Sequence, residues 1–370
     1  MKERKISIKK ILLLFNILLL IIFIILVYLF FSGNIKFSDN SIRSGIINVK
    51  SPPYNAKGDG KHDDTKAIQK AINDLVDGGG IIYLPKGSYN ISSSLKIKDG
   101  ITLRGIGSLG TIIRNTGTGY AIESIEKKRS KTSTMVEDKV RRYQTIENIT
   151  VQGTDNAEGG IKLSFSGEYF EINKVRILGN INGVGLNLQD SYSGIIQNVH
   201  VSQSTNNTGI KLQARQVSSG QISFINVVVA HSKYGVEIGE SYNTSSAQII
   251  DSVSFTGCIF QHNEKAGLRI GSNVRHIDVR SSHFEWQDEP SAVGLQINGQ
   301  SAFGGSIVSS WFYKNETAIQ IDNAEGYIFE SLNIQNGTNG VVTTANASQI
   351  HLGKYIRYTN IKNNIVNSAH

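Results

Sequence analysis

The sequence predicts an all-β protein, a right-handed single-stranded parallel β-helix that carries an N-terminal capping helix and is preceded by one transmembrane helix. Three observations support this fold class. A Gly-aliphatic-x-aliphatic motif recurs along the chain, 37 glycines stand against 4 prolines, and one long apolar segment lies near the N-terminus. Such a composition favours many short strands joined by tight turns. The single cysteine, Cys258, excludes an intrachain disulfide framework and a cysteine-based zinc site.

The apolar segment covers residues 11–31, "ILLLFNILLLIIFIILVYLFF", and has no charged residue. At about 1.5 Å per residue it is long enough to cross a hydrocarbon core of roughly 30 Å. Basic residues predominate before it, so the positive-inside rule predicts a cytoplasmic N-terminus and an extracytoplasmic remainder at the cell membrane. A cleaved signal peptide is the alternative, but its apolar stretch usually runs about 7–15 residues and ends at small residues. We therefore expect a basic tail (1–10), a transmembrane signal-anchor (11–31), a linker (32–45) and one β-helix domain (46–370).

The acidic stretch "GDGKHDDTKAIQKAI", residues 58–72, predicts the start of a fold and not a metal site. Asp64 has the position of a helix N-cap, because apolar residues follow it at helical spacing and three glycines then stop the helix. An EF-hand loop would need oxygen ligands at alternate positions and a later glutamate, and neither is present. An amphipathic helix here would cover the open end of a β-helix, whose unpaired edge would otherwise recruit other strands.

A basic segment, "EKKRSKTSTMVEDKVRRYQ" at residues 126–144, lacks strand alternation and predicts an inserted loop. Two interpretations remain open: a solvated loop, or a contact for a polyanion such as an acidic glycan. We expect no nucleic-acid partner, because the segment has one aromatic residue and the domain faces outward.

The recurring motif sets the predicted architecture. It reads "GIKL", "GLNL", "GIKL", "GVEI", "GLRI", "GLQI" and "AIQI", beginning at positions 160, 185, 209, 235, 267, 294 and 318. Three strands of about five residues plus turns fill such a period, and each strand is too short to build a core alone. Stacked coils at about 4.8 Å solve this, whereas a propeller needs a period of about 40 residues or more. Asparagines at 148, 173, 198 and 226 predict a stacked turn with amides bonding along the axis.

Residues 46–106 also resemble a known family. "YNAKGDGKHDDTKAIQKAI", "GGGIIYLPKGSYNI" and "LRGIG" are similar to the N-terminal signature of the pectate lyase superfamily domain, which rhamnogalacturonases, epimerase-like proteins and phage tailspikes share. The resemblance implies a right-handed β-helix and an extracellular polysaccharide as substrate or ligand. It does not name the chemistry, because the fold hosts lyases, hydrolases and non-catalytic binders. It also implies that a homotrimer is possible, as in tailspike-like relatives.

If each motif is a strand, its third residue points outward, and stacking forms one row: Lys162, Asn187, Lys211, Glu237, Arg269, Gln296 and Gln320. The loop that leads into these strands supplies a second set: His231, His262, Glu264, Glu285, Trp286, Asp288 and Glu289. In the polysaccharide-active β-helices that this chain resembles, that strand face and that loop form the substrate groove. We therefore expect consecutive coils to bring both sets together.

Two chemistries fit this set. A hydrolase needs two carboxyl groups about 5–9.5 Å apart, for which Glu285 pairs with Glu237 or with Asp288. A lyase acting on a uronic acid needs a base, and a cation such as Arg269 or Lys211 to hold the sugar carboxylate. Ca²⁺ is expected only in the lyase case, and no metal ligands are predicted. Candidate catalytic residues are Glu285, Glu237, Arg269 and Asp288; candidate substrate-binding residues are His262, Trp286, Lys211, His231 and Gln296.

The leading prediction is an anchored enzyme that cleaves a polysaccharide, as a lyase or a glycosidase. The alternative is a non-catalytic glycan-binding or envelope-structural protein. Polygalacturonases of this fold carry Asn-Thr-Asp, Asp-Asp, His-Gly and Arg-Ile-Lys motifs in their coils, and this chain lacks that set; its one Asp-Asp pair is Asp63–Asp64. The row also lacks the run of aspartates that would hold Ca²⁺ in a typical pectate lyase. Trp311 is expected to pack under a loop.

Overall fold

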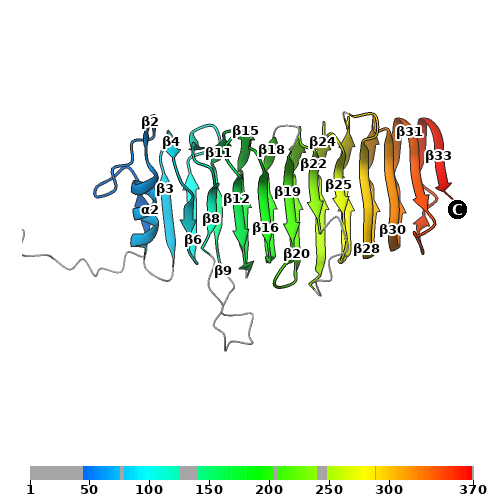
Figure 1. Ribbon diagram of the computed structural model, residues 1–370, viewed down its shortest axis with the longest axis horizontal. Helices are drawn as coiled ribbons and strands as arrows, with labels where there is room; N and C mark the ends of the chain where they lie inside the picture. Colours follow the sequence, from blue (N-terminus) through cyan, green and yellow to red (C-terminus); the bar gives the residue numbers. More distant parts are fainter. Residues whose placement is uncertain are drawn as a thin grey trace, which may run out of the picture. The chain divides into compact units, whose positions relative to one another are not determined.

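The structure, a computed structural model, describes residues 45–75, 79–125, 141–167, 169–179, 181–202, 207–239, 248–287 and 289–368. The predicted tail, the transmembrane segment and all of the linker except Gly45 lie outside these ranges. Within the described ranges, no helix is long and apolar enough to span a membrane. The chain from Gly45 onward winds into a parallel β-helix of about 11 coils (Figure 1), which confirms the all-β solenoid prediction.

Each coil contributes strands to three columns, A, B and C, in that order along the chain. Column A contains β1 (Ile46–Asn48), β3 (Gly80–Leu84), β6 (Ile101–Gly105), β10 (Thr145–Glu147), β14 (Phe170–Asn173), β17 (Tyr192–Gln197), β20 (Ser219–Ile225), β23 (Ile250–Thr256), β26 (Val274–Arg280) and β32 (His351–Leu352). Column B contains β2 (Asp59–Asp63), β4 (Gly87–Ile91), β7 (Thr111–Asn115), β11 (Thr150–Gly153), β15 (Arg176–Gly179), β18 (His200–Ser202), β21 (Val228–Ala230), β24 (Ile259–Gln261), β27 (His283–Glu285) and β29 (Trp311–Tyr313).

Column C contains β5 (Leu95–Ile97), β8 (Tyr120–Ser124), β12 (Gly159–Ser164), β16 (Val184–Gln189), β19 (Thr208–Gln213), β22 (Tyr234–Ile238) and β25 (Ala266–Ile270). Near the C-terminal end the strands lengthen and pass through two columns. These are β28 (Val293–Val308) and β30 (Thr317–Glu330), from C into A, and β31 (Asn333–Thr344) and β33 (Arg357–Ser368), from B into C. A separate two-stranded sheet pairs β9 (Arg141–Arg142) with β13 (Ser166–Gly167), so the end of the predicted basic loop is a short strand; residues 126–140 lie outside the described ranges.

The predicted capping helix is α2 (Thr65–Asp74), which lies at the blue end of the solenoid (Figure 1). Its residues Ile68, Ala71 and Ile72 are fully buried and belong to the same hydrophobic core as the coils. Asp64 does occupy the N-cap position, but its side chain does not cap the helix. The predicted N-cap position is confirmed, but the buried carboxylate turns back, accepts hydrogen bonds from the backbone N–H groups of Lys57 (2.6 Å) and Gly58 (2.9 Å), and so closes the loop before β2.

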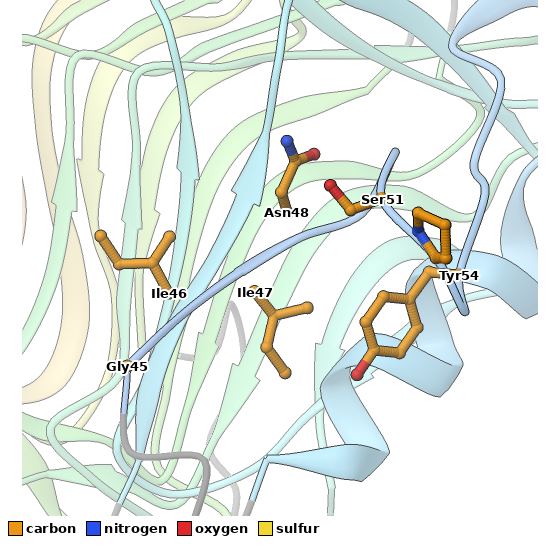
Figure 2. A pocket seen from close by; sticks show the side chains of 7 residues that line it. Gly45, Ile46, Ile47, Asn48, Ser51 and Tyr54 are labelled. Carbon is orange, nitrogen blue, oxygen red and sulfur yellow. The ribbon is translucent and has the colours of Figure 1, made fainter.

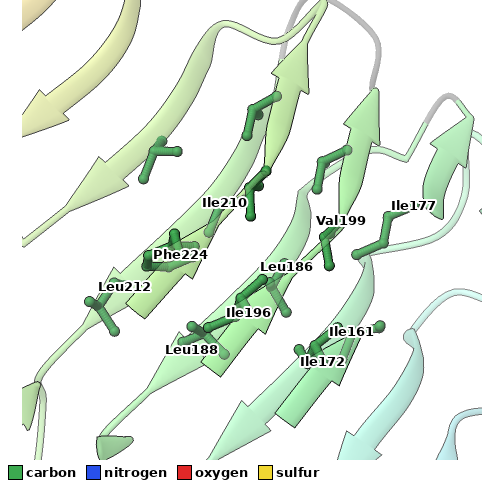
Figure 3. Close-up of a cluster of buried hydrophobic side chains, with 14 of the residues drawn as sticks. Ile161, Ile172, Ile177, Leu186, Leu188, Ile196, Val199, Ile210, Leu212 and Phe224 are labelled. Carbon is green, nitrogen blue, oxygen red and sulfur yellow. The ribbon is translucent and has the colours of Figure 1, made fainter. Parts of the chain in front are cut away.

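The core runs along the inside of the coils. In column C, Ile161, Leu186 and Ile210 pair in register and are fully buried, and Leu188 and Leu212 form a parallel inner row (Figure 3). Further along, phenylalanine rings stack between coils, with centroid distances of 4.7 Å for Phe224–Phe255 and 4.5 Å for Phe284–Phe312. Because the inner residues alternate with outer ones, each aliphatic pair fixes the residue between them on the outer face.

The glycine of the recurring motif has a steric cause. A Cβ on Gly209, Gly235 or Gly267 would lie 2.5 to 2.8 Å from the carbonyl oxygen of the equivalent residue in the next coil. A side chain added at these three positions would strain the contact between coils. The motif therefore marks a close backbone approach in column C, and Ala318 takes the same position in the last of the motifs.

The predicted asparagine turn lies between columns A and B. Asn148, Asn198 and Asn226 occupy the same left-handed position in their coils, whereas Lys174, not Asn173, holds it in the coil between Asn148 and Asn198. Asn226 Nδ2 donates to Asn198 Oδ1 (2.9 Å), and Asn198 Nδ2 donates to Asn173 Oδ1 (3.2 Å). Asn198 and Asn226 have φ values of 55° and 53°, in the left-handed region that asparagine tolerates better than most residues. The equivalent residue one coil further on is Gly257, with φ of 63° and nothing within 4 Å of where its Cβ would be.

These two glycine environments give a matched test. Gly235→Ala is expected to lower the free energy of unfolding by about 1–3 kcal/mol, because the added methyl overpacks the coil–coil contact. Gly257→Asn is expected to change it by less than about 0.5 kcal/mol, since the turn is open and Asn226 holds the same position in the preceding coil. Chemical denaturation of both variants measures the difference, and equal stability of the two would contradict the packing explanation.

Candidate functional site

Column C arranges the predicted outward residues in one continuous row. Strand pairing aligns Lys162, Asn187, Lys211, Glu237, Arg269, Gln296 and Gln320 directly, coil by coil. The row also extends toward the N-terminal end through Glu123 and Lys96, which the sequence analysis did not include. We call these nine residues the charged row; it holds four cationic and two carboxylate side chains.

The centre of the charged row is an ion-paired triplet on three successive coils. Arg269 Nη1 lies 3.3 Å from Glu237 Oε1, and Lys211 Nζ lies 3.5 Å from Glu237 Oε2. The Glu237 side chain is only 9% exposed, against 13% for Arg269 and 23% for Lys211. Arg269 also stacks over the ring of Tyr234 at 5.0 Å, and its Nε is buried without a hydrogen-bond partner. Glu237 is therefore held between two cations, and is less exposed than an outward strand position predicts.

A second feature follows the corner between columns B and C, directly after each column B strand. The rings of His231 and His262 stack at 5.2 Å, and those of His262 and Trp286 at 5.4 Å. Lys314 continues the series, with its Nζ 5.6 Å from the Trp286 ring centroid. We call His231, His262 and Trp286 the corner stack. These three residues and Lys314 have φ between 44° and 54°, so the same left-handed turn presents each side chain in the same direction.

Buried polar side chains hold the corner stack in place. The residue after each ring is Ser232, Asn263 or Gln287, and all three are buried. Gln287 Oε1 accepts from the Asn263 backbone N–H (3.0 Å), and Asn263 Oδ1 accepts from that of Ser232 (3.2 Å). A left-handed backbone conformation is unfavourable for most residues other than glycine, so these hydrogen bonds are needed to stabilise the turn. The rings consequently sit on a rigid support.

The structure separates Glu285 from the charged row. Glu285 is the last residue of β27 in column B, where its Oε1 lies 2.9 Å from Nδ1 of His283 on the same strand. Glu237 lies in column C, two coils away, so the two backbones are about 10 Å apart along the axis alone. Asp288 lies outside the described residues. Of the predicted residues, Lys211, Glu237, Arg269 and Gln296 share the charged row and His231, His262 and Trp286 share the corner stack, while Glu285 belongs to a third group.

Several side chains beside these features were missed from the sequence. Tyr234 was overlooked because it stands just before the glycine motif, at the residue where the strand starts. Tyr313 and Lys314 were overlooked because column B strands have no glycine motif to show their register. Trp311 does not simply pack under a loop: it lies on the outer side of column B, in edge contact with His283 at 5.2 Å.

Surface depressions lie in the N-terminal part of the solenoid. One of about 480 Å³ lies on the charged row and is lined by Lys96, Glu123 and Lys162. Another of about 500 Å³, beside β1 (Figure 2), is lined by Gly45, Ile46, Ile47, Asn48, Ser51, Pro52 and Tyr54. The second has no ionisable lining group except the Tyr54 phenol, so it does not offer acid–base chemistry. The first coincides with the predicted polysaccharide face.

The described residues do not suit a calcium site. Among them, no three His, Cys, Asp or Glu side chains lie close enough to share a metal ion. The two carboxylates of the charged row are each paired with a cation, Glu123 with Lys96 and Glu237 with Lys211 and Arg269. Ca²⁺ prefers six to eight oxygen ligands, which this set does not supply. We therefore assign no role to Ca²⁺ at the row.

The described residues form a parallel β-helix with a charged row along its axis, and this fold defines the class of the protein. Within that class, the chain belongs to the rhamnogalacturonase A/epimerase, pectate lyase-like family, whose model matches residues 46–259. The fold recurs in a crystal structure of PfbA, a surface adhesin of Streptococcus pneumoniae, with a TM-score of 0.65, 13% identity and coverage of 86% of this chain and 91% of that one. It also recurs in a family 28 exopolygalacturonase of Yersinia enterocolitica, with a TM-score of 0.57, 11% identity and coverage of 88% and 78%.

Curated relatives that match by sequence include an epimerase and a binding protein. Mannuronan C5-epimerase AlgE3 of Azotobacter vinelandii is 38% identical over 92 residues, which is 23% of this chain and 5% of the relative. Plasmin and fibronectin-binding protein A of Streptococcus pneumoniae is 24% identical over 372 residues, covering 85% of this chain and 49% of the relative. This chain therefore spans about half the length of the second relative and a small part of the first.

The ion-paired triplet is expected to contribute to stability as well as to any binding. Glu237→Gln leaves Lys211 and Arg269 facing each other without their carboxylate, and is expected to lower the free energy of unfolding by about 1–3 kcal/mol. The double variant Glu237→Leu/Arg269→Met is expected to lose less, because it removes both charges of the more buried pair. Gln296→Ala, one coil away, serves as the control. If denaturation curves give Glu237→Gln and Gln296→Ala the same free energy of unfolding, this assignment is contradicted.

Proposed function

We propose that the protein acts on an acidic polysaccharide that lies along the charged row. The single observation that carries this proposal is the alignment of Lys96, Lys162, Lys211 and Arg269 on one outer face, in register and parallel to the axis. Coils repeat at about 4.8 Å, so these cations present a line of positive charge matched to an extended, negatively charged polymer. The row has an excess of two positive charges, since Glu123 and Glu237 offset two of the four. The depression at Lys96 and Lys162 lies on the same line.

Cleavage of that polysaccharide is the leading form of the proposed activity. In a lyase, Arg269 and Lys211 would hold the sugar carboxylate while a base, for which His262 is the adjacent candidate, removes the neighbouring proton. In a hydrolase, Glu285, with His283 at 2.9 Å, would be one carboxyl group and Asp288 the other. The epimerase and exopolygalacturonase relatives support an action on uronate-containing polymers.

Non-catalytic glycan binding is the second candidate. The pneumococcal relative favours binding without cleavage, because it is named as a plasmin- and fibronectin-binding protein and the match runs over 85% of this chain. Binding without cleavage is also favoured by the triplet, since both oxygens of Glu237 are engaged by Arg269 and Lys211. In this case the row would hold the polymer without breaking it.

One incubation series separates these forms. The full chain, purified in a detergent without a sugar headgroup, is mixed with alginate, polygalacturonate and a neutral glucan. New ultraviolet absorbance of an unsaturated uronate indicates elimination, new reducing ends without it indicate hydrolysis, and retention alone indicates binding. Lys211→Ala is expected to weaken retention of both polyuronates, since it removes one cation of the row. If no acidic polymer is retained or altered, the proposed function is wrong.

Any cleavage detected also tests the residue assignments. Glu285→Gln is expected to abolish hydrolysis, and Arg269→Lys to slow elimination more than it weakens binding, because a point charge replaces a planar guanidinium. Full activity in both variants would mean that the reacting sugar lies elsewhere.

We also propose that residues 11–31 anchor the protein in a cell membrane, with the β-helix domain outside. The proposal is supported by the length of the apolar segment and the basic residues before it. A C-terminal epitope on the full chain is expected to be accessible on intact cells, and the protein to resist extraction at high pH. Deletion of residues 1–31 is expected to release it. Extraction of the full chain at high pH, or an epitope hidden from outside, would contradict the anchor.

A further inference from the structure

Both tryptophans of the 370-residue chain lie in one cluster on the outer side of column B. Strands β27 and β29 pair in register, which places His283 beside Trp311 and Glu285 beside Tyr313. Trp286 follows β27 at the corner and meets the Tyr313 ring at 5.7 Å, while Trp311 meets Tyr313 at 5.4 Å. We call Trp286, Trp311 and Tyr313 the aromatic platform.

The platform remains accessible although its rings are fixed. Trp286 is 38% exposed, yet it is stacked on His262 at one side and touches Tyr313 at the other. Lys314 Nζ lies over both the Trp286 ring and the Tyr313 ring, 5.6 Å and 5.5 Å from their centroids. The indole N–H of Trp311 is buried and has no hydrogen-bond partner. An exposed aromatic ring that is already immobilised loses little conformational entropy on binding.

The polar groups around the platform suit hydroxyl groups better than another protein surface. Glu285 and His283 lie beside Tyr313 and Trp311, and Lys314 lies over the Tyr313 ring. Beyond Lys314 a depression of about 440 Å³ is lined mostly by amide, hydroxyl and carboxylate side chains, among them Gln287, Asn336 and Thr338. A flat apolar ring face surrounded by hydrogen-bonding groups matches a pyranose ring, which has an apolar C–H face and hydroxyls around its edge.

The charged row loses its charge at the same level of the solenoid. The column C residues of the coils containing β27 and β29 are Gln296 and Gln320, which continue the row after Arg269 as neutral amides. A polymer that extends from the cationic part of the row past the corner therefore meets aromatic rings and amides, not cations. The recognition there depends on ring stacking and hydrogen bonds, and needs no sugar carboxylate.

We propose that the aromatic platform is a separate binding subsite for an uncharged pyranose residue, adjoining the cationic part of the charged row. The inference rests on the proposed function in one respect: the ligand is a polysaccharide. It adds that the bound polymer contains, or tolerates, neutral sugars at the C-terminal end of the site.

Intrinsic fluorescence tests the subsite directly, because both tryptophans of the chain report from it. The full chain in a detergent without a sugar headgroup is titrated with neutral manno-, cello- and galacto-oligosaccharides, and the same series is repeated by calorimetry. We expect a saturable change in emission with at least one of them. Trp286→Ala and Tyr313→Ala are expected to weaken that binding roughly two- to tenfold or more, because each removes a stacking surface.

Two controls separate this subsite from the proposed function. Tyr355→Ala removes an aromatic side chain that is 74% exposed elsewhere and is expected to change nothing. Lys211→Ala is expected to weaken binding of alginate or polygalacturonate while leaving neutral oligosaccharides unaffected. Neutral binding that is absent, or unchanged in Trp286→Ala and Tyr313→Ala, overturns the subsite even if polyuronates still bind. If neither class of glycan binds, both the subsite and the proposed function are wrong.

Discussion

The in-register hydrogen bonding of parallel strands between coils is the constraint on which the rest of this structure depends. Each coil must present the same face as its neighbours at a spacing of about 4.8 Å, because a slip of one residue would turn every aliphatic inner residue outward. Residues two dozen positions apart in the sequence thereby become direct neighbours. The rows of Ile161, Leu186 and Ile210 inside, and of Lys211, Glu237 and Arg269 outside, result from the same pairing.

That constraint also explains how a surface can be built one side chain at a time. A change in one coil alters one step of a row and leaves the others in place. The charged row shows this: cations and carboxylates alternate through Lys96, Glu123 and Lys162, and two glutamines follow Arg269. The corner stack and Lys314 show the same stepwise change, since one left-handed turn carries histidine, histidine, tryptophan and lysine in successive coils. Side-chain identity changes along the axis while the backbone positions repeat.

Much of this arrangement was predictable from the sequence, for a physical reason. Gly235 and Gly267 stand where the backbones of neighbouring coils approach closely, so the motif fixes the register of column C and with it the whole row from Lys162 to Gln320. Column B has no such marker. From the sequence alone Glu285 is therefore expected in a loop beside Glu237, whereas it ends a strand and pairs with His283. The burial of Glu237 could not be predicted either, because the ion pairs that enclose it involve long side chains from two other coils.

The central claim, that the row is straight and in register, is most directly tested by distances between spin labels on its outward positions. Cysteines are introduced in pairs at Lys162 and one of Lys211, Arg269 or Gln320; Cys258 can remain, since it is buried and burial raises the pKa of its thiol to about 11. Pulsed electron paramagnetic resonance is expected to give separations that grow by about 4.8 Å per coil, reaching about 29 Å for the six steps from Lys162 to Gln320. Separations that do not increase with the number of coils would contradict the account.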